Sequence, residues 1–363
     1  MKVALIGVGQ AGGKLAQRIA EFDYEMDFGA VQGGLAVNTA KQDLVPLDLD
    51  AVLVGQDRVK GHGVGGDNEL GAEIMQDDAD EVMDALDDRI TAKAEAIVLI
   101  AALGGGTGSG GAPVLARALG RVYSVPVYTL GVLPGRDEGS LYQANAGRSL
   151  KTVVRESDAT ILVDNDAWQE SGESVAAAYD QINDAIARRF GLLLAAGEVD
   201  PEDDVAESIV DSSEIINTLR SGGMAAMGYA TAAPGEDSAD NVNAISSVVR
   251  NALLTNTSLP NASRADAALV VVAGRPEAIP RKGVERARKW VEEETGSLEV
   301  RGGDYPVDSD QLAAIVLLGG IERSPRVEEF MERAAAAREE AEAAAEAAGP
   351  DDQFNNDQLE DLF

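Results

Sequence analysis

The sequence predicts an α/β protein: a parallel sheet with helices on both faces, then a long helix, then a second, smaller α/β domain. Three observations support this fold class. The first half of the chain alternates short apolar runs with helix-type patterning, which is typical of parallel sheets. Glycine-rich segments connect several of these runs to the helices that follow. At 363 residues the chain also exceeds the usual size of a single core, which favours two domains.

Six strands and four helices are predicted in the first half. The strands are expected near residues 3–6, 33–37, 52–54, 97–102, 125–130 and 160–163. The helices are expected at 14–22, 71–88, 113–123 and 142–156. In open parallel sheets, ligands bind beyond the carboxyl ends of the strands. Each glycine-rich segment falls at that edge, so we expect the functional site there.

A long helix should separate the two domains. Apolar side chains recur every three or four residues at Val175, Tyr179, Ile182, Ile186 and Phe190, which predicts a helix over about residues 173–194. The chain beyond suggests helices at 214–219, 241–254 and 283–295 and strands at 268–273, 298–301 and 313–318. The predicted boundaries are 1–172 for the first domain, 173–196 for the central helix, 197–213 for the connecting loop, 214–333 for the second domain and 334–363 for the tail.

The end of the chain is strongly biased in composition. Residues 327–348 are rich in Ala and Glu and favour a helix, whereas the acidic segment 351–363 is expected to be disordered. The closing residues 359–363 (LEDLF) place apolar side chains on this charged tail. Two interpretations stay open: a docking peptide for a protein partner, or an inert solubilising tail.

The charge balance excludes several classes of partner. The net charge of −33 arises from 63 Asp and Glu against 30 Lys and Arg. Such a surface repels nucleic acid and anionic membranes. Molar salt would screen the self-repulsion, so the composition indicates a halophile, with a basic protein partner as the alternative. Without cysteine, signal-peptide pattern or membrane-length apolar run, the chain is expected to be a cytoplasmic protein with no nucleic-acid partner and no membrane insertion.

Residues 104–110 (GGGTGSG) are the most informative stretch. They follow an apolar strand-like run and precede a helix-like segment. Glycines let backbone N–H groups approach a ligand closely, and the positive end of the helix dipole favours an anion. Thr107 and Ser109 add hydroxyl donors. A phosphate-binding loop is therefore predicted, in preference to a flexible linker.

A second glycine motif introduces a competing function. Residues 7–12 (GVGQAG) match the dinucleotide-binding pattern, and Asp27 lies near the distance expected for a ribose-binding acid, so an NAD-dependent oxidoreductase is a rival interpretation. Two phosphate loops fit a triphosphate better. A Walker A site is excluded because Leu15 follows Lys14. A third loop at 61–69 could wrap the terminal phosphate, with Asp67 or Glu69 near Mg²⁺ through water; His62, the single histidine, is given a minor role at most.

Three side chains are candidates for holding a nucleobase. Asn165 follows a predicted strand, while Tyr179 and Asn183 stand four residues apart on one face of the long helix. A ring beside a carboxamide can stack on a base and hydrogen-bond to its edge. Glu138 could accept hydrogen bonds from ribose hydroxyls.

Together these motifs resemble the tubulin/FtsZ superfamily, and the haloarchaeal CetZ group in particular. Residues 104–110 reproduce the tubulin signature in full, and 7–13 resemble the first phosphate loop. The pair Asn38-Thr39 is similar to the second loop, 61–69 to the third and Glu138-Gly139 to the ribose contact. The resemblance covers about residues 1–330 in order, and 210–219 (VDSSEIINTL) with the acidic composition point to CetZ.

This resemblance implies a Rossmann-like GTP-binding domain, a central helix and a C-terminal α/β domain. It implies GTP or GDP as ligand, with Mg²⁺ accompanying the nucleotide and K⁺ as a further candidate ion. The implied contacts are Gln10, Ala11, Gly12, Gly13, Lys14, Asn38, Gly105, Gly106, Thr107, Gly108, Ser109, Glu138, Asn165, Tyr179 and Asn183.

The resemblance also implies head-to-tail self-assembly, in which the next subunit completes the active site. Glu214 best matches the catalytic carboxylate, supported by Asp211; the alternative is a helix cap with its capping-box acid. Ile209 stands where the FtsZ pattern has asparagine, and residues 140–142 (SLY) replace the basic residues usual in FtsZ, so hydrolysis is expected to be slow. The expected function is a cytoskeletal GTPase of cell shape or motility. The alternatives are a non-polymerising GTP-binding regulator and the oxidoreductase.

Overall fold

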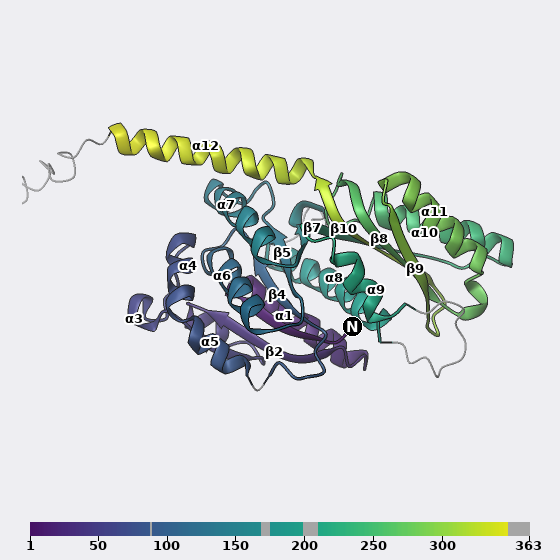
Figure 1. Cartoon of the computed structure of the whole chain (residues 1–363), viewed down its shortest axis with the longest axis horizontal. Helices are drawn as coiled ribbons and strands as arrows, with labels where there is room; N and C mark the ends of the chain where they lie inside the picture. The colour runs from purple at the N-terminus through teal and green to yellow at the C-terminus, as the bar shows by residue number, and fades with distance from the viewer. Residues whose placement is uncertain (88, 168–174, 199–209, 348–363) are drawn as a thin grey trace, which may run out of the picture.

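A single sheet extends through both halves of the chain (Figure 1). The computed structural model describes residues 1–87, 89–167, 175–198 and 210–347. Within these residues ten strands pair in the order β3-β2-β1-β4-β5-β6-β7-β10-β8-β9. The predicted α/β fold class is confirmed, and the sheet is mostly parallel.

The first six strands are all parallel and form one half of the sheet. They are β1 (Val3–Val8), β2 (Val31–Asn38), β3 (Asp50–Leu53), β4 (Ala96–Ala102), β5 (Val127–Leu133) and β6 (Ala159–Asp164). The strand predicted at 125–130 is shifted: β5 begins after Pro126, which has no N–H to donate to the ladder.

The helices between these strands begin earlier than predicted. They are α1 (Gly9–Glu25), α2 (Lys41–Leu44), α3 (Gln56–Val59), α4 (Asn68–Asp77), α5 (Ala79–Leu86), α6 (Thr107–Val122) and α7 (Ser140–Glu156). The single helix expected at 71–88 is wrong. Asp78 interrupts the helix between α4 and α5. Its carboxylate accepts a hydrogen bond from the Gly55 N–H at 2.6 Å. The short helices α2 and α3 were not predicted.

The predicted long helix is present as α8 (Val175–Ala196), after the short 3-10 helix η1 (Asn165–Ala167). Its side chains Ile182, Ile186 and Phe190 are buried, as the periodicity predicts. They join a core on the sheet face covered by α1, α8 and α9 (Ser212–Leu219). The opposite face is covered by α5, α6 and α7 in the first half, so the fold has three layers.

The second half adds four strands and two covering helices. The elements are β7 (Met224–Ala232), α10 (Ser238–Leu254), β8 (Ser263–Gly274), η2 (Pro276–Ala278), α11 (Arg281–Thr295), β9 (Glu299–Pro306) and β10 (Leu312–Arg323). Strand β7 was not predicted. It joins the halves by pairing with β6 in parallel at Thr160–Met224 and Ile161–Ala225. β10 runs antiparallel to both β7 and β8, and β9 runs parallel to β8.

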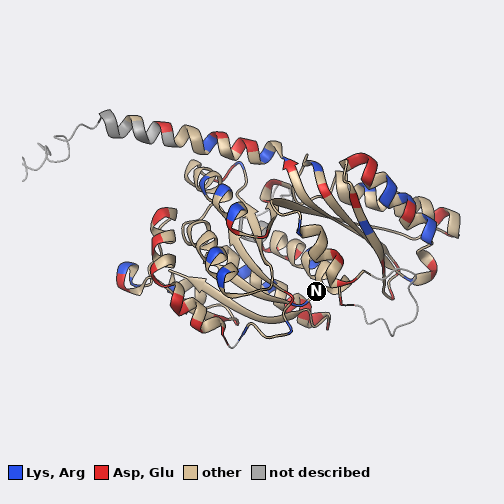
Figure 2. Ribbon diagram, in the orientation of Figure 1, with Lys and Arg blue, Asp and Glu red and all other residues tan. Residues whose placement is uncertain are grey.

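Helix α12 (Pro325–Ala347) packs its first part against α7 and then extends beyond the body (Figure 1). The helix predicted at 327–348 is confirmed up to Ala347, and the acidic tail 351–363 lies outside the described residues. Figure 2 shows acidic residues spread over the outer helices, including α4, α5 and α12. Among the described helices, none combines the length and the apolar character that crossing a membrane requires.

Candidate functional site

The glycine-rich segments meet at the carboxyl edge of the parallel strands, as predicted. A Cβ placed on Gly9, at the end of β1, would lie 2.9 Å from the backbone nitrogen of Gly108, after β4. The hydroxyls of Thr39, after β2, and Thr107 lie 2.7 Å apart and are both buried. Because these contacts bring together three separate strand ends, the loops form one surface.

Residues 104–110 present an open backbone on a tightly packed base. A Cβ on Gly108 would lie 2.9 Å from the Ala102 carbonyl oxygen, and one on Gly110 would lie 2.1 Å from that of Asn68. Gly105, in contrast, has open space where a Cβ would stand. Thr107 begins α6, so the loop amides and the helix N-terminus face the same region. This arrangement can bind an anion.

The two hydroxyls of this loop are engaged within the protein. Ser109 donates its hydroxyl to the carbonyl oxygen of Gly105, and Thr107 is paired with Thr39. The structure therefore assigns these side chains to holding the loop in shape. Their role as ligand donors stays a prediction.

The first turn of α1 contains both buried and exposed residues. Gln10, Ala11 and Lys14 are exposed beside the loops, whereas Gly12 and Gly13 are buried. A Cβ on Gly12 would lie 2.2 Å from the carbonyl oxygen of Ile100 in β4. The glycines therefore let α1 approach the sheet.

Asp43, in α2, was not predicted and connects two predicted residues. It accepts hydrogen bonds from Gln10 Nε2 at 3.1 Å and from Asn38 Nδ2 at 3.2 Å. The Asn38 Oδ1 atom in turn accepts from the backbone of Thr39 at 2.8 Å. Asn38 and Gln10 are thus held at one place on the rim.

The acidic side chains of the third loop have partners within the protein. Asp67 is the N-cap of α4 and accepts from the N–H groups of Glu69 and Leu70 at 3.1 and 3.0 Å. Glu69 is exposed and lies 3.7 Å from Arg148. In the part of the chain that the structure describes, no group of three or more acidic or histidine side chains is arranged to hold a metal ion. The placement of Mg²⁺ near Asp67 or Glu69 through water stays a prediction.

Glu138, Asn165 and Tyr179 come together at the ends of β5 and β6. Glu138 Oε1 accepts from the Gly135 N–H at 2.8 Å and from Asn165 Nδ2 at 3.1 Å. The Tyr179 hydroxyl also hydrogen-bonds to Glu138, and burial, reinforced by the Glu138 charge, raises the pKa of Tyr179 to about 12. Tyr179 therefore stays protonated and can donate to this carboxylate.

The Asn165 carboxamide has one unused atom. Asn165 is only 5% exposed, and its Oδ1 atom has no hydrogen-bond partner among the described residues. Because the Glu138 carboxylate can only accept, Asn165 must present its NH₂ group to Glu138. Its oxygen is left as a buried acceptor.

Asn183 lies one helical turn beyond Tyr179, in a pocket of about 270 Å³ between α1 and α8. Lys14 and Arg18 of α1 line the same pocket. Arg18 Nε contacts Asp184 Oδ1 at 2.5 Å, which ties α1 to α8. The structure therefore places Asn183 and Lys14 in one pocket, one helical turn along α8 from Tyr179.

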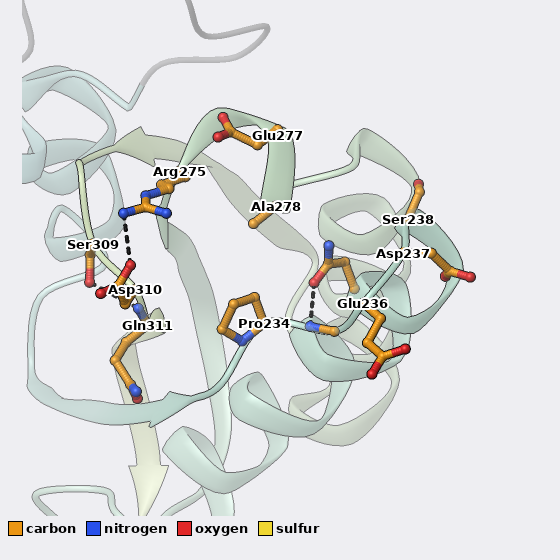
Figure 3. A pocket seen from close by; sticks show the side chains of 12 residues that line it. Pro234, Glu236, Asp237, Ser238, Arg275, Glu277, Ala278, Ser309, Asp310 and Gln311 are labelled. Carbon is orange, nitrogen blue, oxygen red and sulfur yellow. Dashed lines mark hydrogen bonds and ion pairs between the residues drawn. The ribbon is translucent and has the colours of Figure 1, made fainter.

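A second pocket, of about 360 Å³, lies in the other half of the chain (Figure 3). It is lined by residues that follow β7 and β8 and precede β10, none of them a predicted site residue. Its Arg275 is ion-paired with Asp308 at 2.9 Å and Asp310 at 2.7 Å, so this cation is already neutralised. We assign this pocket no part in the site.

The two candidate catalytic carboxylates lie at the opposite edge of the sheet. Ser212 Oγ, at the start of α9, contacts Glu95 Oε1 at 2.5 Å, and Glu95 directly precedes β4. Seven residues of β4 at about 3.3 Å each put roughly 20 Å between this edge and the glycine loops. Within one copy, Asp211 and Glu214 are therefore not brought to the phosphate-binding surface.

Asp211 and Glu214 have distinct surroundings. Asp211 is the N-cap of α9 and accepts from the Glu214 N–H at 3.1 Å, the structural role that the sequence also allowed. Burial raises the pKa of Glu214, the Asp211 charge adds to the shift, and Arg301 and Arg288 oppose it. Glu214 Oε2 is buried without a hydrogen-bond partner in the described parts of the chain. Such a carboxylate is suited to accept a proton.

Asp27, the residue that favoured the oxidoreductase, lies at the wrong edge for that chemistry. It falls between α1 and β2, before the amino end of β2, with a φ of 56°. A ribose-binding acid of the dinucleotide fold must follow the carboxyl end of that strand, beside the glycine loop. Asp27 cannot take this role.

The inner face of α7 carries supporting residues that the sequence reading missed. Asn145 Nδ2 donates to the carbonyl oxygens of Gly66 and Gly104, at 2.8 and 3.1 Å. Gln143 Nε2 donates to Glu138 O at 3.2 Å, and Ser149 Oγ donates to Ser109 O at 2.7 Å. All three side chains are buried. The sequence does carry a signal for them: they are polar residues at positions of α7 where the helical periodicity predicts apolar ones.

Comparisons with known proteins agree over both halves of the chain. Residues 2–173 match the GTPase domain of the tubulin/FtsZ family, and residues 172–336 match the C-terminal domain of tubulin-like CetZ. The tubulin-like protein CetZ2 of Haloferax volcanii is 64% identical over 363 residues, covering all of both chains.

Two solved structures are similar over nearly the whole fold. A GTPγS-bound protofilament of H. volcanii CetZ2 has a TM-score of 0.90 at 65% identity, covering 94% of this chain and 100% of that one. A GDP-bound monomer of H. volcanii CetZ1 has a TM-score of 0.86 at 50% identity, covering 93% and 100%.

Proposed function

The chain belongs to the CetZ family of tubulin/FtsZ-like GTPases, and we propose that it is a cytoskeletal GTPase that binds GTP between head-to-tail copies of itself. One observation carries the proposal: the phosphate-type loops and the carboxylate of Glu214 lie at opposite edges of one sheet. Only a second copy, stacked edge to edge, brings them together. A contact of this heterologous kind does not close, so it generates a filament.

The phosphates of GTP would bind at the open backbone of residues 105–109 and the first turn of α1. The amides there are preorganised by the packing of Gly108, and Gln10 and Lys14 are exposed beside them. When bound with the nucleotide, Mg²⁺ would neutralise charge on the terminal phosphates, and K⁺ is a further candidate. Leu141 and Tyr142 replace basic residues at the rim, so this chain adds little positive charge of its own there.

Guanine recognition is assigned to Asn165, Asn183 and the ring of Tyr179, and the ribose contact to Glu138. The buried Oδ1 atom of Asn165 can accept a hydrogen bond from a base. Guanine offers adjacent N–H donors at N1 and N2 on its Watson–Crick edge, whereas adenine has an acceptor at N1 and a donor only at N6. The amide orientation fixed by Glu138 therefore favours GTP over ATP.

Hydrolysis is assigned to Glu214 of the adjoining copy, with Asp211 in support. Phosphoryl transfer depends mainly on positioning and charge stabilisation, so one carboxylate that orients water can complete the site. Burial raises the pKa of Glu214 and makes it a better proton acceptor than an exposed glutamate. Asp211 fixes the start of α9, which carries Glu214.

The solved relatives support these assignments without standing in for this chain. H. volcanii CetZ2 has been seen as a GTPγS-bound protofilament and CetZ1 as a GDP-bound monomer. We extend the proposal to a cytoplasmic role in cell shape or motility, and to a protein partner for residues 359–363. The acidic composition and the H. volcanii relatives support a halophilic source.

The test is GTP hydrolysis as a function of protein concentration in about 3 M KCl with Mg²⁺, where surface repulsion is screened, with light scattering on the same samples. We expect specific activity to rise above a threshold concentration at which scattering also appears. Constant specific activity without scattering would instead support a GTP-binding regulator that does not polymerise. Absence of GTP binding would overturn the function altogether.

A further inference from the structure

One buried arginine anchors helix α12 at the carboxyl edge of the parallel strands. Arg326, in its first turn, is only 3% exposed. Its Nε atom donates to Asp164 Oδ2 at 3.2 Å, and its Nη2 atom donates to the Pro134 carbonyl oxygen at 2.7 Å. The guanidinium also lies over the Phe330 ring, 4.2 Å from its centroid. A buried cation thus connects α12 to the points where the loops after β5 and β6 begin.

Both of these loops carry proposed nucleotide contacts. Pro134 opens the segment that leads to Glu138, and Asp164 directly precedes Asn165. The two loops are also joined by the hydrogen bond between Asn165 and Glu138. Arg326 therefore joins the Pro134 carbonyl group to the Asp164 side chain, next to the segments that carry the proposed ribose and base contacts.

Four side chains of alternating charge form a ring of ion pairs beside these segments. Arg136 contacts Asp166 at 2.8 Å and Glu329 at 3.1 Å. Glu329 contacts Arg326 at 2.9 Å, and Arg326 returns to Asp166 at 3.5 Å. The ring links Asp166, next to Asn165, to α12 twice, directly through Arg326 and by way of Arg136 and Glu329. Beside this ring, the ion pair of Arg326 with Asp164 is buried, so salt screens it far less than the exposed pairs on the surface.

The contact between α12 and α7 is close enough to make this docking specific. A Cβ on Gly147 of α7 would lie 2.3 Å from the Phe330 carbonyl oxygen and 2.5 Å from the Ala334 Cβ. Phe330 is fully buried. The helix can therefore not shift along α7 without moving Arg326 as well.

We propose that Arg326 is a positioning residue for the nucleotide site, through which the docking of α12 and the binding of GTP are coupled. This inference rests on the proposed function. Linkage requires the coupling to be reciprocal: a docked α12 strengthens nucleotide binding, and bound nucleotide holds α12 in place. The chain thereby gains a route from its protruding C-terminal helix to its nucleotide affinity.

The first test compares Arg326→Gln with Arg333→Gln in the full chain, at molar KCl. Arg333 lies two turns further along α12, is 40% exposed and pairs with Glu329 alone among the ring residues. We expect Arg326→Gln to weaken GTP binding by at least about fivefold and to reduce the preference for GTP over ATP. Arg333→Gln should stay within about twofold of wild type. Equal affinities and equal selectivity in a folded Arg326→Gln protein would overturn the proposal.

The second test needs no substitution and therefore covers the case in which Arg326→Gln does not fold. Hydrogen exchange of the α12 backbone amides is measured in the wild-type chain with and without GTP. The proposal expects slower exchange over residues 326–336 when GTP is bound. Unchanged exchange in this segment, at saturating GTP, would refute the coupling while leaving the GTPase proposal intact. If wild type bound no GTP, the proposed function itself would fail.

Discussion

Replacing Asn165 by alanine should weaken GTP binding while the protein remains folded. In the structure Asn165 Oδ1 is buried and lacks a hydrogen-bond partner among the described residues, and Nδ2 is committed to Glu138 at 3.1 Å. A base N–H that satisfies this acceptor gains about 1–3 kcal/mol, the usual penalty for leaving such a group unpaired. That difference corresponds to about a 5- to 150-fold change in Kd.

The measurement is a calorimetric titration with GTP and with ATP at the same salt concentration. The alanine variant should lose GTP affinity by this factor and lose little of its weak affinity for ATP, because adenine offers no donor at N1. Glu138 keeps its bonds to the Gly135 N–H and to Tyr179, so thermal stability should change little. A GTP affinity within about twofold of wild type would refute the assignment of Asn165 and the amide argument behind it.

Three further predictions concern catalysis, packing and pH. Glu214→Gln should retain GTP affinity but reduce turnover by about 10²- to 10⁴-fold in a phosphate-release assay; near-normal turnover would remove Glu214 from the mechanism. Gly110→Ala should lower the free energy of unfolding by about 3 kcal/mol, because its methyl group would lie 2.1 Å from the Asn68 carbonyl oxygen. The control Gly120→Ala, in open space on the same helix, should be neutral or stabilising. Equal melting temperatures of the two variants would contradict this. Hydrogen bonds from Arg117 and then Arg155 lower the pKa of Glu156 from its ordinary 4.5, so its stabilising effect is present above that pH and is lost as pH falls through the lowered pKa. Glu156→Gln should therefore flatten the acid limb of the stability profile, and an unchanged limb would disprove the role of the pair that joins α6 to α7.

Much of the site could be predicted because its parts are local in the sequence. A glycine run between an apolar strand and a helix identifies a loop at the carboxyl edge, and parallel strands bring such loops together. The loops after β1 and β4 were placed correctly for this reason. The helix period likewise identified α8, since its buried positions recur every three or four residues.

The missed features depend on tertiary contacts or on weak local signals. Strand β7 (MAAMGYATA) is rich in alanine, which has low strand propensity, and the strand forms because it is buried between β6 and β10. Asp43 acts only because α2 places it between Gln10 and Asn38. Arg326 reaches Asp164 across 162 residues of chain, a separation that no periodic pattern records.

The packed base of the 104–110 loop bears on the kinetics of binding. Backbone neighbours fix Gly108 and Gly110, and the hydroxyls of Thr107 and Ser109 are already bonded within the protein. The loop therefore has its shape before any ligand arrives, and little conformational entropy is lost on capture. Variants that alter contacts to the nucleobase should then associate with nucleotide at nearly the wild-type rate and differ in how long the nucleotide stays bound.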